Sequence, residues 1–94
     1  MRNPKVSIII NCLNSEIFLG EAIDTVLAQT YTDWEIILWD NCSTDNTRMI
    51  VERYNEDRIR YYISSKQTSL GEARNQALKK ANGEFIAFLD SDDL

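Results

Sequence analysis

Short runs of apolar residues along this chain alternate with segments in which apolar residues recur every three or four positions. The run at 5–10 is apolar at almost every position, which is typical of a parallel strand buried on both faces. Similar runs lie at 34–39, 58–63 and 84–89, and the run at 58–63 is amphipathic enough for a strand at or near an edge. The pattern therefore predicts four strands.

Helical spacing of apolar residues fills the first interval between these runs. The helix is predicted to have Ser15 as its N-cap and Glu16 in its first turn, where a carboxylate faces the helix dipole favourably. Its apolar face is formed by Leu19, Ala22, Ile23, Val26 and Leu27.

Two more helices are predicted in the remaining intervals. One covers 47–54, and its inward side chains are those of Ile50, Val51 and Tyr54. The apolar face of the other is formed by Ala73, Ala77, Leu78 and Ala81. The pair Asn82-Gly83 is predicted to cap that helix at its C-terminus.

The resulting order is β-α-β-α-β-α-β, which predicts an α/β fold. We expect a parallel sheet of about four strands with three crossover helices covering both faces. This is the first half of a doubly wound, Rossmann-like arrangement, in which ligands bind beyond the carboxyl ends of the strands.

Polar segments follow three of the predicted strands at that edge of the sheet, at 11–14, 40–43 and 90–93. Two of them contain carboxylates, and carboxylates that converge repel each other unless a cation or a hydrogen-bond donor lies between them. The sequence therefore predicts a functional site where these segments meet.

The Asp90-Ser91-Asp92-Asp93 segment directly follows a buried apolar run. Carboxylate oxygens are the preferred ligands of Mg²⁺ or Mn²⁺, which commonly bridge to the phosphates of a substrate. Asp40, at the end of another buried strand, could accept a hydrogen bond from an imide N–H such as that of uracil. The alternative for Asp40 is a structural role in a turn or at a helix cap.

Composition narrows the function classes. The 44% hydrophobic content and 10% aromatic content are typical of a globular domain. The net charge is -5 and the ten basic residues are scattered, so a nucleic-acid partner is not expected. The apolar runs are too short for a membrane span and no leader pattern precedes them, which predicts a cytoplasmic location.

Cysteine and histidine usage excludes some chemistry. Cys12 and Cys42 lack metal-ligand spacing and are expected to be reduced thiols. The chain has no histidine, so the common Ser-His and Cys-His nucleophile systems are excluded within it.

The chain resembles family 2 glycosyltransferases of the GT-A fold along essentially its whole length. The segments that carry the resemblance, in the family's order and spacing, are 6–14, 28–35, 40–45, 71–75 and 83–93. Four positions depart from the family pattern: Asn11 replaces a proline, Leu13 a tyrosine, Asn41 an aspartate and Cys42 a glycine. The glycine position requires a backbone conformation that a residue with a Cβ can still adopt.

The resemblance implies transfer of a sugar from a nucleoside diphosphate, with a UDP-sugar as the expected donor, to an acceptor hydroxyl with inversion. It implies dependence on Mn²⁺ or Mg²⁺. The nucleotide-binding residues that it implies are Asn11, Leu13, Glu16, Asp40, Lys66, Ser69 and Asp90. It implies Asp92, together with Asp90, as metal ligands.

The family's general base lies downstream of the metal motif, so no catalytic residue is assigned here. Residues 1–94 are expected to be the N-terminal nucleotide-sugar-binding part of a longer catalytic domain, without the acceptor-binding part and inactive alone. The acceptor is expected to be a glycan or a lipid-linked glycan of polysaccharide or cell-envelope synthesis, with the parent enzyme at the inner face of the membrane. The uncovered side of the fourth strand is expected to allow self-association.

Other nucleotide-binding classes share this architecture. A dinucleotide-binding domain and a P-loop both need a glycine-rich first turn, whereas the glycines here are at positions 20, 71 and 83. A nucleotidyltransferase, or a non-catalytic receiver-like module that binds Mg²⁺ without nucleotide, remains an alternative. Metal-dependent UDP binding would separate the transferase from the module.

Overall fold

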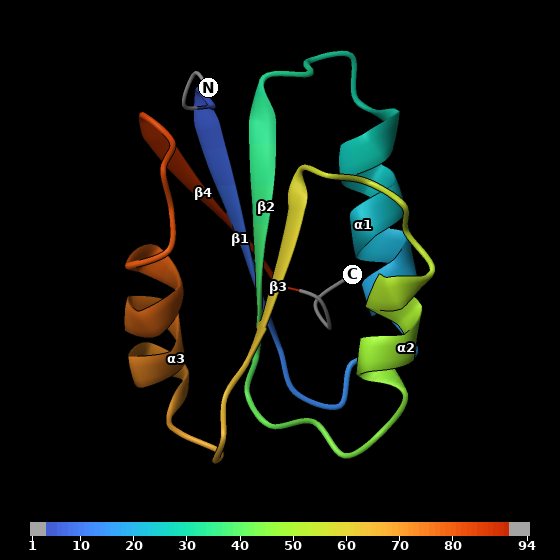
Figure 1. Ribbon diagram of the computed structural model, residues 1–94, viewed down its shortest axis with the longest axis vertical. Helices are drawn as coiled ribbons and strands as arrows, with labels where there is room; N and C mark the ends of the chain where they lie inside the picture. The colour runs from blue at the N-terminus through green and yellow to red at the C-terminus, as the bar shows by residue number, and fades with distance from the viewer. Residues whose placement is uncertain (1–3, 91–94) are drawn as a thin grey trace.

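The computed structural model describes residues 4–90, which fold into three layers around a parallel sheet (Figure 1). The strands are β1 (Val6–Cys12), β2 (Trp34–Asp40), β3 (Ile59–Ile63) and β4 (Phe85–Asp90). The helices are α1 (Leu19–Ala28), α2 (Thr47–Glu52) and α3 (Leu70–Leu78). The predicted α/β fold, with four parallel strands and three crossover helices, is confirmed.

The strands lie in the order β3-β2-β1-β4, so β1 and β2 occupy the centre. Helices α1 and α2 cover one face of the sheet and α3 covers the other (Figure 1). Because successive side chains of a strand point to opposite faces, Ile8 and Ile10 pack against α1 and α2, and Ile9 packs with Ala77 of α3. The continuous apolar runs thus serve two cores, as their lack of alternation predicted.

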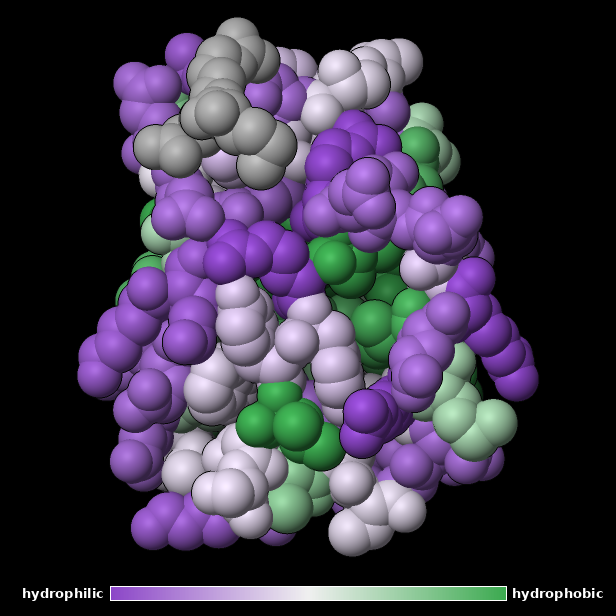
Figure 2. Space-filling view, viewed as in Figure 1, coloured by the Kyte–Doolittle hydropathy of each residue, from purple (hydrophilic) through white to green (hydrophobic). Residues whose placement is uncertain are grey.

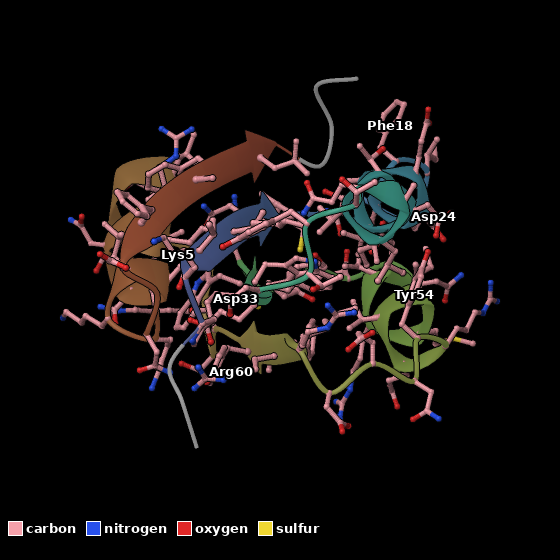
Figure 3. The ribbon with its side chains drawn as sticks, turned by 90° about the horizontal axis from the view of Figure 1, so that it is seen from above. Lys5, Phe18, Asp24, Asp33, Tyr54 and Arg60 are labelled. Carbon is pink, nitrogen blue, oxygen red and sulfur yellow. The ribbon has the colours of Figure 1, made fainter. Side chains whose placement is uncertain are left out.

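Figure 2 shows how polarity is distributed over the β3 side of the molecule. Hydrophilic residues cover the α3 layer, and apolar surface is recessed between the sheet and helices α1 and α2 (Figure 2). In the layer of α1 and α2, Tyr54, which follows α2, contacts α1, since its hydroxyl donates to Asp24 Oδ1 at 2.7 Å (Figure 3). No helix within residues 4–90 has the length and apolar character needed to cross a membrane.

The start of α1 differs from the prediction. The helix begins at Leu19 and its N-cap is Phe18, which has no side-chain cap. The Ser15 hydroxyl instead lies near the backbone of Leu13, at 3.3 Å from its nitrogen. The predicted Ser15 N-cap is therefore wrong. The Ser15 N–H bonds to Thr47, the first residue of α2, and the Glu16 N–H bonds to Asp45 in the loop before it.

One helix end and two residues on predicted buried helix faces also differ from the prediction. Helix α2 ends at Glu52, two residues before the predicted end at 54. Leu27 and Leu78, both predicted to lie on buried faces, are exposed to 37% and 38%. Each directly follows a buried residue of its helix, Val26 and Ala77, at the border of the buried face.

The predicted C-cap at Asn82-Gly83 is wrong, because α3 ends at Leu78 with Lys79 as its C-cap. No glycine of the described chain has a positive φ. Gly83 is instead required by a close approach: a Cβ there would lie 2.5 Å from both the backbone nitrogen and the Oγ of Ser7. The glycine lets the connection from α3 to β4 cross directly over β1.

A buried polar network holds this crossing. Glu35 accepts hydrogen bonds from Ser7 Oγ at 2.6 Å, from the Asn82 N–H at 2.7 Å and from Arg60 Nη1 at 2.9 Å. Burial alone would raise the pKa of Glu35, but these donors outweigh it and hold that pKa below its ordinary value. The network ties β1, β2 and β3 to the start of β4.

Strand β4 is an edge strand. Helix α3 packs mainly against β1 and β2, and it also contacts β4 through Arg74, whose guanidinium carbon lies 5.7 Å from the centroid of the Phe88 ring. Phe85, Ile86 and Phe88 are exposed to 55%, 41% and 50%. The predicted uncovered side of the fourth strand is therefore present in residues 4–90, and self-association through it stays a prediction.

Candidate functional site

The loops that follow β1, β2 and β3 meet at the carboxyl edge of the sheet, together with the end of β4. Strand β1 lies between its two partners, so Cys12 pairs with Asp40 of β2 and Asn11 pairs with Asp90 of β4. This register places the carboxyl ends of β1, β2 and β4 side by side, with Asp90 as the only described residue of the third predicted polar segment.

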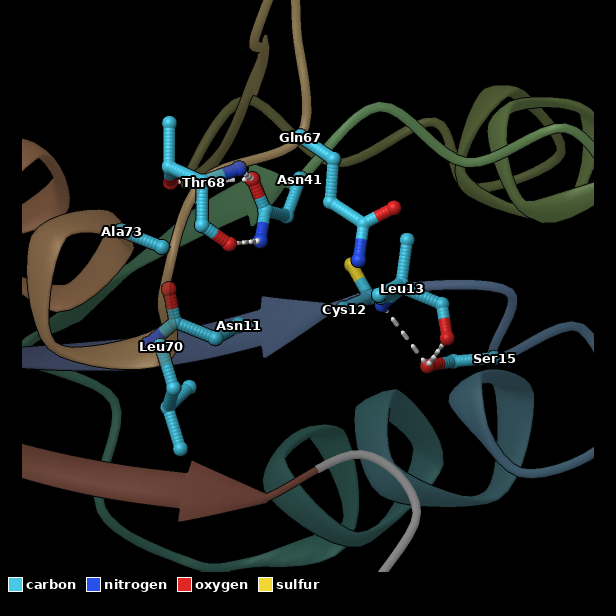
Figure 4. A pocket seen from close by; sticks show the side chains of 9 residues that line it. All are labelled: Asn11, Cys12, Leu13, Ser15, Asn41, Gln67, Thr68, Leu70 and Ala73. Atoms are coloured by element: carbon cyan, nitrogen blue, oxygen red, sulfur yellow. Dashed lines mark hydrogen bonds between the residues drawn. The ribbon is translucent and has the colours of Figure 1, made fainter.

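The first cavity, of about 330 Å³, opens between the β1 loop, the end of β2 and the start of α3 (Figure 4). It is lined by Asn11, Cys12, Leu13, Ser15, Asn41, Gln67, Thr68, Leu70 and Ala73. Burial, followed by the nearby Asp40 and Asp45 carboxylates, raises the pKa of Cys12 so that its thiol stays neutral. Within the described part of the chain, the lining side chains are therefore uncharged, and they combine amides and hydroxyls with two leucines.

Asn41 fixes one wall of the first cavity. Its Oδ1 accepts hydrogen bonds from the Thr68 N–H at 2.9 Å and the Thr68 hydroxyl at 3.1 Å, and its Nδ2 donates to the Thr68 carbonyl at 2.8 Å (Figure 4). An amide can both donate and accept, so it matches the two backbone groups of one residue. The side chain thereby joins the end of β2 to the loop that follows β3.

Asp40 is only 1% exposed and is not among the residues that line the first cavity. Its Oδ1 accepts the Ser43 N–H at 2.8 Å and its Oδ2 accepts the Tyr61 hydroxyl. Burial and this bond to Asp40 raise the pKa of Tyr61. Asp40 thus has the turn role that the sequence left as an alternative, and its contact with a base stays a prediction.

The turn held by Asp40 contains Cys42, whose φ of 68° lies in the left-handed region. Glycine adopts this region without a Cβ penalty, and other residues do so at a cost. The structure therefore explains why the family pattern has a glycine here.

The β1 loop is held by the loop between β2 and α2. The Asn14 N–H donates to Ser43 Oγ at 2.9 Å, and Asn14 Oδ1 accepts the Thr44 N–H at 2.8 Å. Asp45 accepts the Glu16 N–H at 3.1 Å and the Thr47 N–H at 3.0 Å. Burial would raise the pKa of Asp45, but the bonds from Thr47 and Glu16 outweigh it and lower that pKa.

Of the predicted nucleotide-binding residues, Asn11 and Leu13 line the first cavity. Three others lie outside its lining. Glu16 is half-buried beside Asp45, Ser69 caps α3 by accepting the Glu72 N–H at 3.2 Å, and Lys66 lines a second cavity on the other side of its loop.

The sequence did not single out Asn41, Gln67 and Thr68 as cavity residues. Asn41 was noted only as a departure from the family pattern, and the other two belong to the 66–69 loop that was expected near the nucleotide. A polar residue directly after a buried strand was the available signal for Asn41, since such residues point into the region beyond the sheet edge.

The predicted metal ligands lie at the end of the described chain. Asp90 is the last residue of β4, beside Asn11 in the register, and Asp92 lies outside the described residues. Among the side chains that the structure describes, no group of three His, Cys, Asp or Glu residues could hold a metal. The donor set of Asp90 and Asp92 nevertheless fits a hard divalent cation, because both are carboxylates.

Comparison with known proteins gives the family. The profile of "Glycosyl transferase family 2" matches residues 7–94. The UDP-Glc:alpha-D-GlcNAc-diphosphoundecaprenol beta-1,3-glucosyltransferase WfgD of Escherichia coli is 45% identical over 89 residues, which are 95% of this chain and 35% of that protein. The chain therefore spans about a third of the length of WfgD and of several other curated relatives, and as little as 14% of another.

Solved structures share the fold. Residues 1–349 of S. aureus TarS in complex with UDP-GlcNAc superpose with a TM-score of 0.89 at 37% identity, over 94% of this chain and 26% of that one. The mannosyltransferase PcManGT of Pyrobaculum calidifontis, in complex with GDP-Man and Mn²⁺, gives a TM-score of 0.87 at 26% identity, over 98% of this chain and 28% of that one. The Rossmann-like sheet is that of the GT-A glycosyltransferases, and the chain belongs to glycosyl transferase family 2.

Proposed function

We propose that this chain forms the nucleotide-sugar-binding part of an enzyme that transfers a sugar from a UDP-sugar to an acceptor hydroxyl with inversion. The observation that carries the proposal is the uncharged first cavity at the carboxyl edge of the sheet, in a chain whose relative TarS has been solved with UDP-GlcNAc. Ligands of α/β sheets bind at this edge, and the cavity volume lies within the range of small-molecule sites.

The first cavity suits the base rather than the diphosphate. Uracil is neutral and presents both an imide donor and carbonyl acceptors, which the amides of Asn11 and Gln67 can match. Leu13, 37% exposed at the cavity, would cover the ring by apolar contact. In this proposal Asp40 acts by fixing the turn beside the base.

The diphosphate is proposed to lie toward the end of β4. Asp90 and Asp92 would hold Mn²⁺ or Mg²⁺ there, and the bound cation supplies Lewis-acid stabilisation of the departing diphosphate. Asp90 is assigned to this region because it pairs with Asn11 in the register of β1 and β4. The side chains of this chain would bind and orient the nucleotide before transfer.

No general base is proposed within the first cavity, because none of the described residues that line it is a carboxylate or an imidazole. We therefore expect this chain alone to bind nucleotide without transferring sugar. The acceptor is proposed to be a glycan or a lipid-linked glycan, the kind of acceptor named for WfgD, in a cytoplasmic enzyme that works at the inner face of the membrane.

The proposal is tested by titrating the chain with UDP in the presence and absence of Mn²⁺. We expect binding that strengthens with Mn²⁺, and we expect Asp92→Asn to remove that gain while Asn11→Ala weakens binding with or without the metal. Asp57→Asn, an exposed carboxylate in the loop before β3, is the matched control. Mn²⁺ binding that is indifferent to UDP would instead favour a non-catalytic metal-binding module.

A further inference from the structure

Three consecutive backbone N–H groups of the loop between β1 and α1 each donate to a side-chain oxygen of the 43–47 segment. The three pairs are Asn14 with Ser43 Oγ at 2.9 Å, Ser15 with Thr47 Oγ1 at 3.1 Å, and Glu16 with Asp45 Oδ2 at 3.1 Å. The acceptors lie 29 to 32 positions later in the chain than the donors. The shape of the 13–16 loop therefore depends on the second crossover of the fold.

The 13–16 loop forms one wall of the first cavity. Leu13 and Ser15 both line that cavity, and Leu13 is the side chain proposed to cover the base (Figure 4). Between them, Asn14 has a φ of 52°, in the left-handed region that a residue with a Cβ adopts at a cost. Such a conformation persists where the surrounding contacts hold it. The position of Leu13 at the cavity is therefore tied to the bonds made by the loop.

Thr47 accepts the central one of the three bonds. It is the first residue of α2, and its side chain is fully buried. Its hydroxyl accepts the Ser15 N–H and donates to Asp45 Oδ1, which a hydroxyl can do at the same time. The bond to Ser15 is buried, and a buried N–H that loses its acceptor is costly.

Asp45 supports this contact from the side of α2. Its Oδ1 accepts the Thr47 hydroxyl and N–H, and its Oδ2 accepts the Glu16 N–H. Hydrogen bonds to an ionised carboxylate are stronger than those between neutral groups. Neither Asp45 nor Thr47 is among the residues that line the first cavity, so both can act on a ligand there only through the loop.

We propose that Thr47, held by Asp45, is a positioning residue for nucleotide binding. Its hydroxyl fixes the Ser15 N–H and thereby keeps Leu13 in place at the cavity before the nucleotide arrives. A wall that is already formed lowers the conformational cost of binding. Thr47 thus sets nucleotide affinity without touching the nucleotide, and this inference rests on the function proposed above.

Thr47→Val is the decisive substitution, because valine keeps the branched shape and lacks the hydroxyl. We expect it to weaken UDP binding about tenfold, measured by calorimetry with Mn²⁺ present. Thr47→Ser keeps the hydroxyl and removes a buried methyl group. It is expected to lower stability in urea denaturation and to retain UDP affinity within a factor of about two, because the bond to Ser15 is still made.

Two further variants separate the loop contact from packing. Val51→Ala truncates a buried side chain on the same helix, away from the loop, so it should lower stability and leave UDP affinity unchanged. Ser43→Ala removes the acceptor of the Asn14 N–H at a half-buried position outside the core. It should weaken UDP binding in the same direction as Thr47→Val, which tests the loop contact without a change in the core.

Hydrogen exchange tests the loop without nucleotide. In the free chain, followed by NMR, Thr47→Val is expected to speed exchange of the Ser15 amide about tenfold or more, because local opening becomes easier. Thr47→Ser should leave that amide protected.

The outcomes separate this inference from the proposed function. Unchanged Ser15 exchange in Thr47→Val would overturn the inference, whether or not the chain binds UDP. An equal loss of UDP affinity in Thr47→Val, Thr47→Ser and Val51→Ala would also overturn it, because the effect would then follow from packing. No UDP binding by the unsubstituted chain would overturn the proposed function, and the nucleotide role of Thr47 with it, while faster Ser15 exchange in Thr47→Val would still support the loop contact.

Discussion

Asn41 and Thr68 are joined by three hydrogen bonds, although they lie on different loops and 27 positions apart in the chain. Two of the bonds use the amide oxygen and the third uses the amide nitrogen. This relationship depends on the asparagine, because an aspartate in the same place has no donor for the Thr68 carbonyl.

Asn41→Asp should therefore loosen the wall of the first cavity. The lost donor and the new repulsion between carboxylate and carbonyl are expected to lower the free energy of unfolding by about 1–3 kcal/mol. UDP binding, measured by calorimetry, should weaken as well. Asn55→Asp, at an exposed position, is the control. Tighter UDP binding by Asn41→Asp would mean that a carboxylate at this position contacts the base directly, as the family pattern allows.

Cys42→Gly is expected to stabilise the chain. A residue with a Cβ has a cost of roughly 1–2 kcal/mol in the left-handed region, and glycine removes it while adding freedom to the unfolded state, so the net gain should be about 0.5–1 kcal/mol. Urea denaturation measures the gain. Cys42→Ala keeps the Cβ and should bring no such gain, and equal stabilisation by both substitutions would rule out backbone relief as the cause.

Gly83→Ala is expected to destabilise the chain by about 1–3 kcal/mol, in the range of overpacked sites, because its Cβ meets the backbone of Ser7. Gly71→Ala is the matched control, since nothing lies within 4 Å of a Cβ there and the position is helical. That substitution should raise stability by roughly 0.5–1 kcal/mol. Thermal unfolding of the two variants compares them directly, and a tolerated Gly83→Ala would contradict the close crossing.

Glu35 makes stability depend on acid pH. Its pKa is lowered in the folded state, so its contribution is complete above its ordinary pKa of 4.5 and is lost as the pH falls through the lower folded value. Glu35→Gln should flatten the acid limb of the unfolding free energy against pH and lower stability at pH 7 by about 1–3 kcal/mol, since Arg60 loses its charged partner.

Glu84→Gln is the control for this pH profile, because the Glu84 side chain is 66% exposed. It should leave the acid limb unchanged. A Glu35→Gln profile that superposes on that of the unsubstituted chain would show that the network has no such linkage.

The four strands could be predicted because each is a run of apolar residues long enough to be recognised from its local pattern. The residues at 8–10 and 36–38 are buried on both faces of the sheet. Their apolar pattern alone was therefore sufficient to predict buried strands. The errors arose where long-range contacts decided the outcome. Ser15 bonds to Thr47 of α2 and does not cap α1, and Gly83 was required by Ser7 rather than by a helix end.

The location of the site at the carboxyl edge of the sheet could be predicted, but the roles of its individual residues could not. Asn11 and Leu13 line the first cavity because they end a central strand, which the sequence shows. The different roles of Asp40 and Asn41 were not visible, because neighbouring residues of a turn point in different directions. Only Tyr61 and Thr68, more than twenty positions away, determine which of the two faces the cavity.

The strand order has a consequence for how the chain folds. Strands β1 and β2 are close in sequence, since Val6 pairs with Trp34. The pairing of β1 with β4 joins residues much farther apart in the sequence, since Val6 also pairs with Phe85. Closing such a long loop is slow, and during synthesis the first three strands can associate before the fourth has emerged. Asp90 arrives with β4, so the carboxylate side of the site can be assembled only after the contacts among β1, β2 and β3 have become possible.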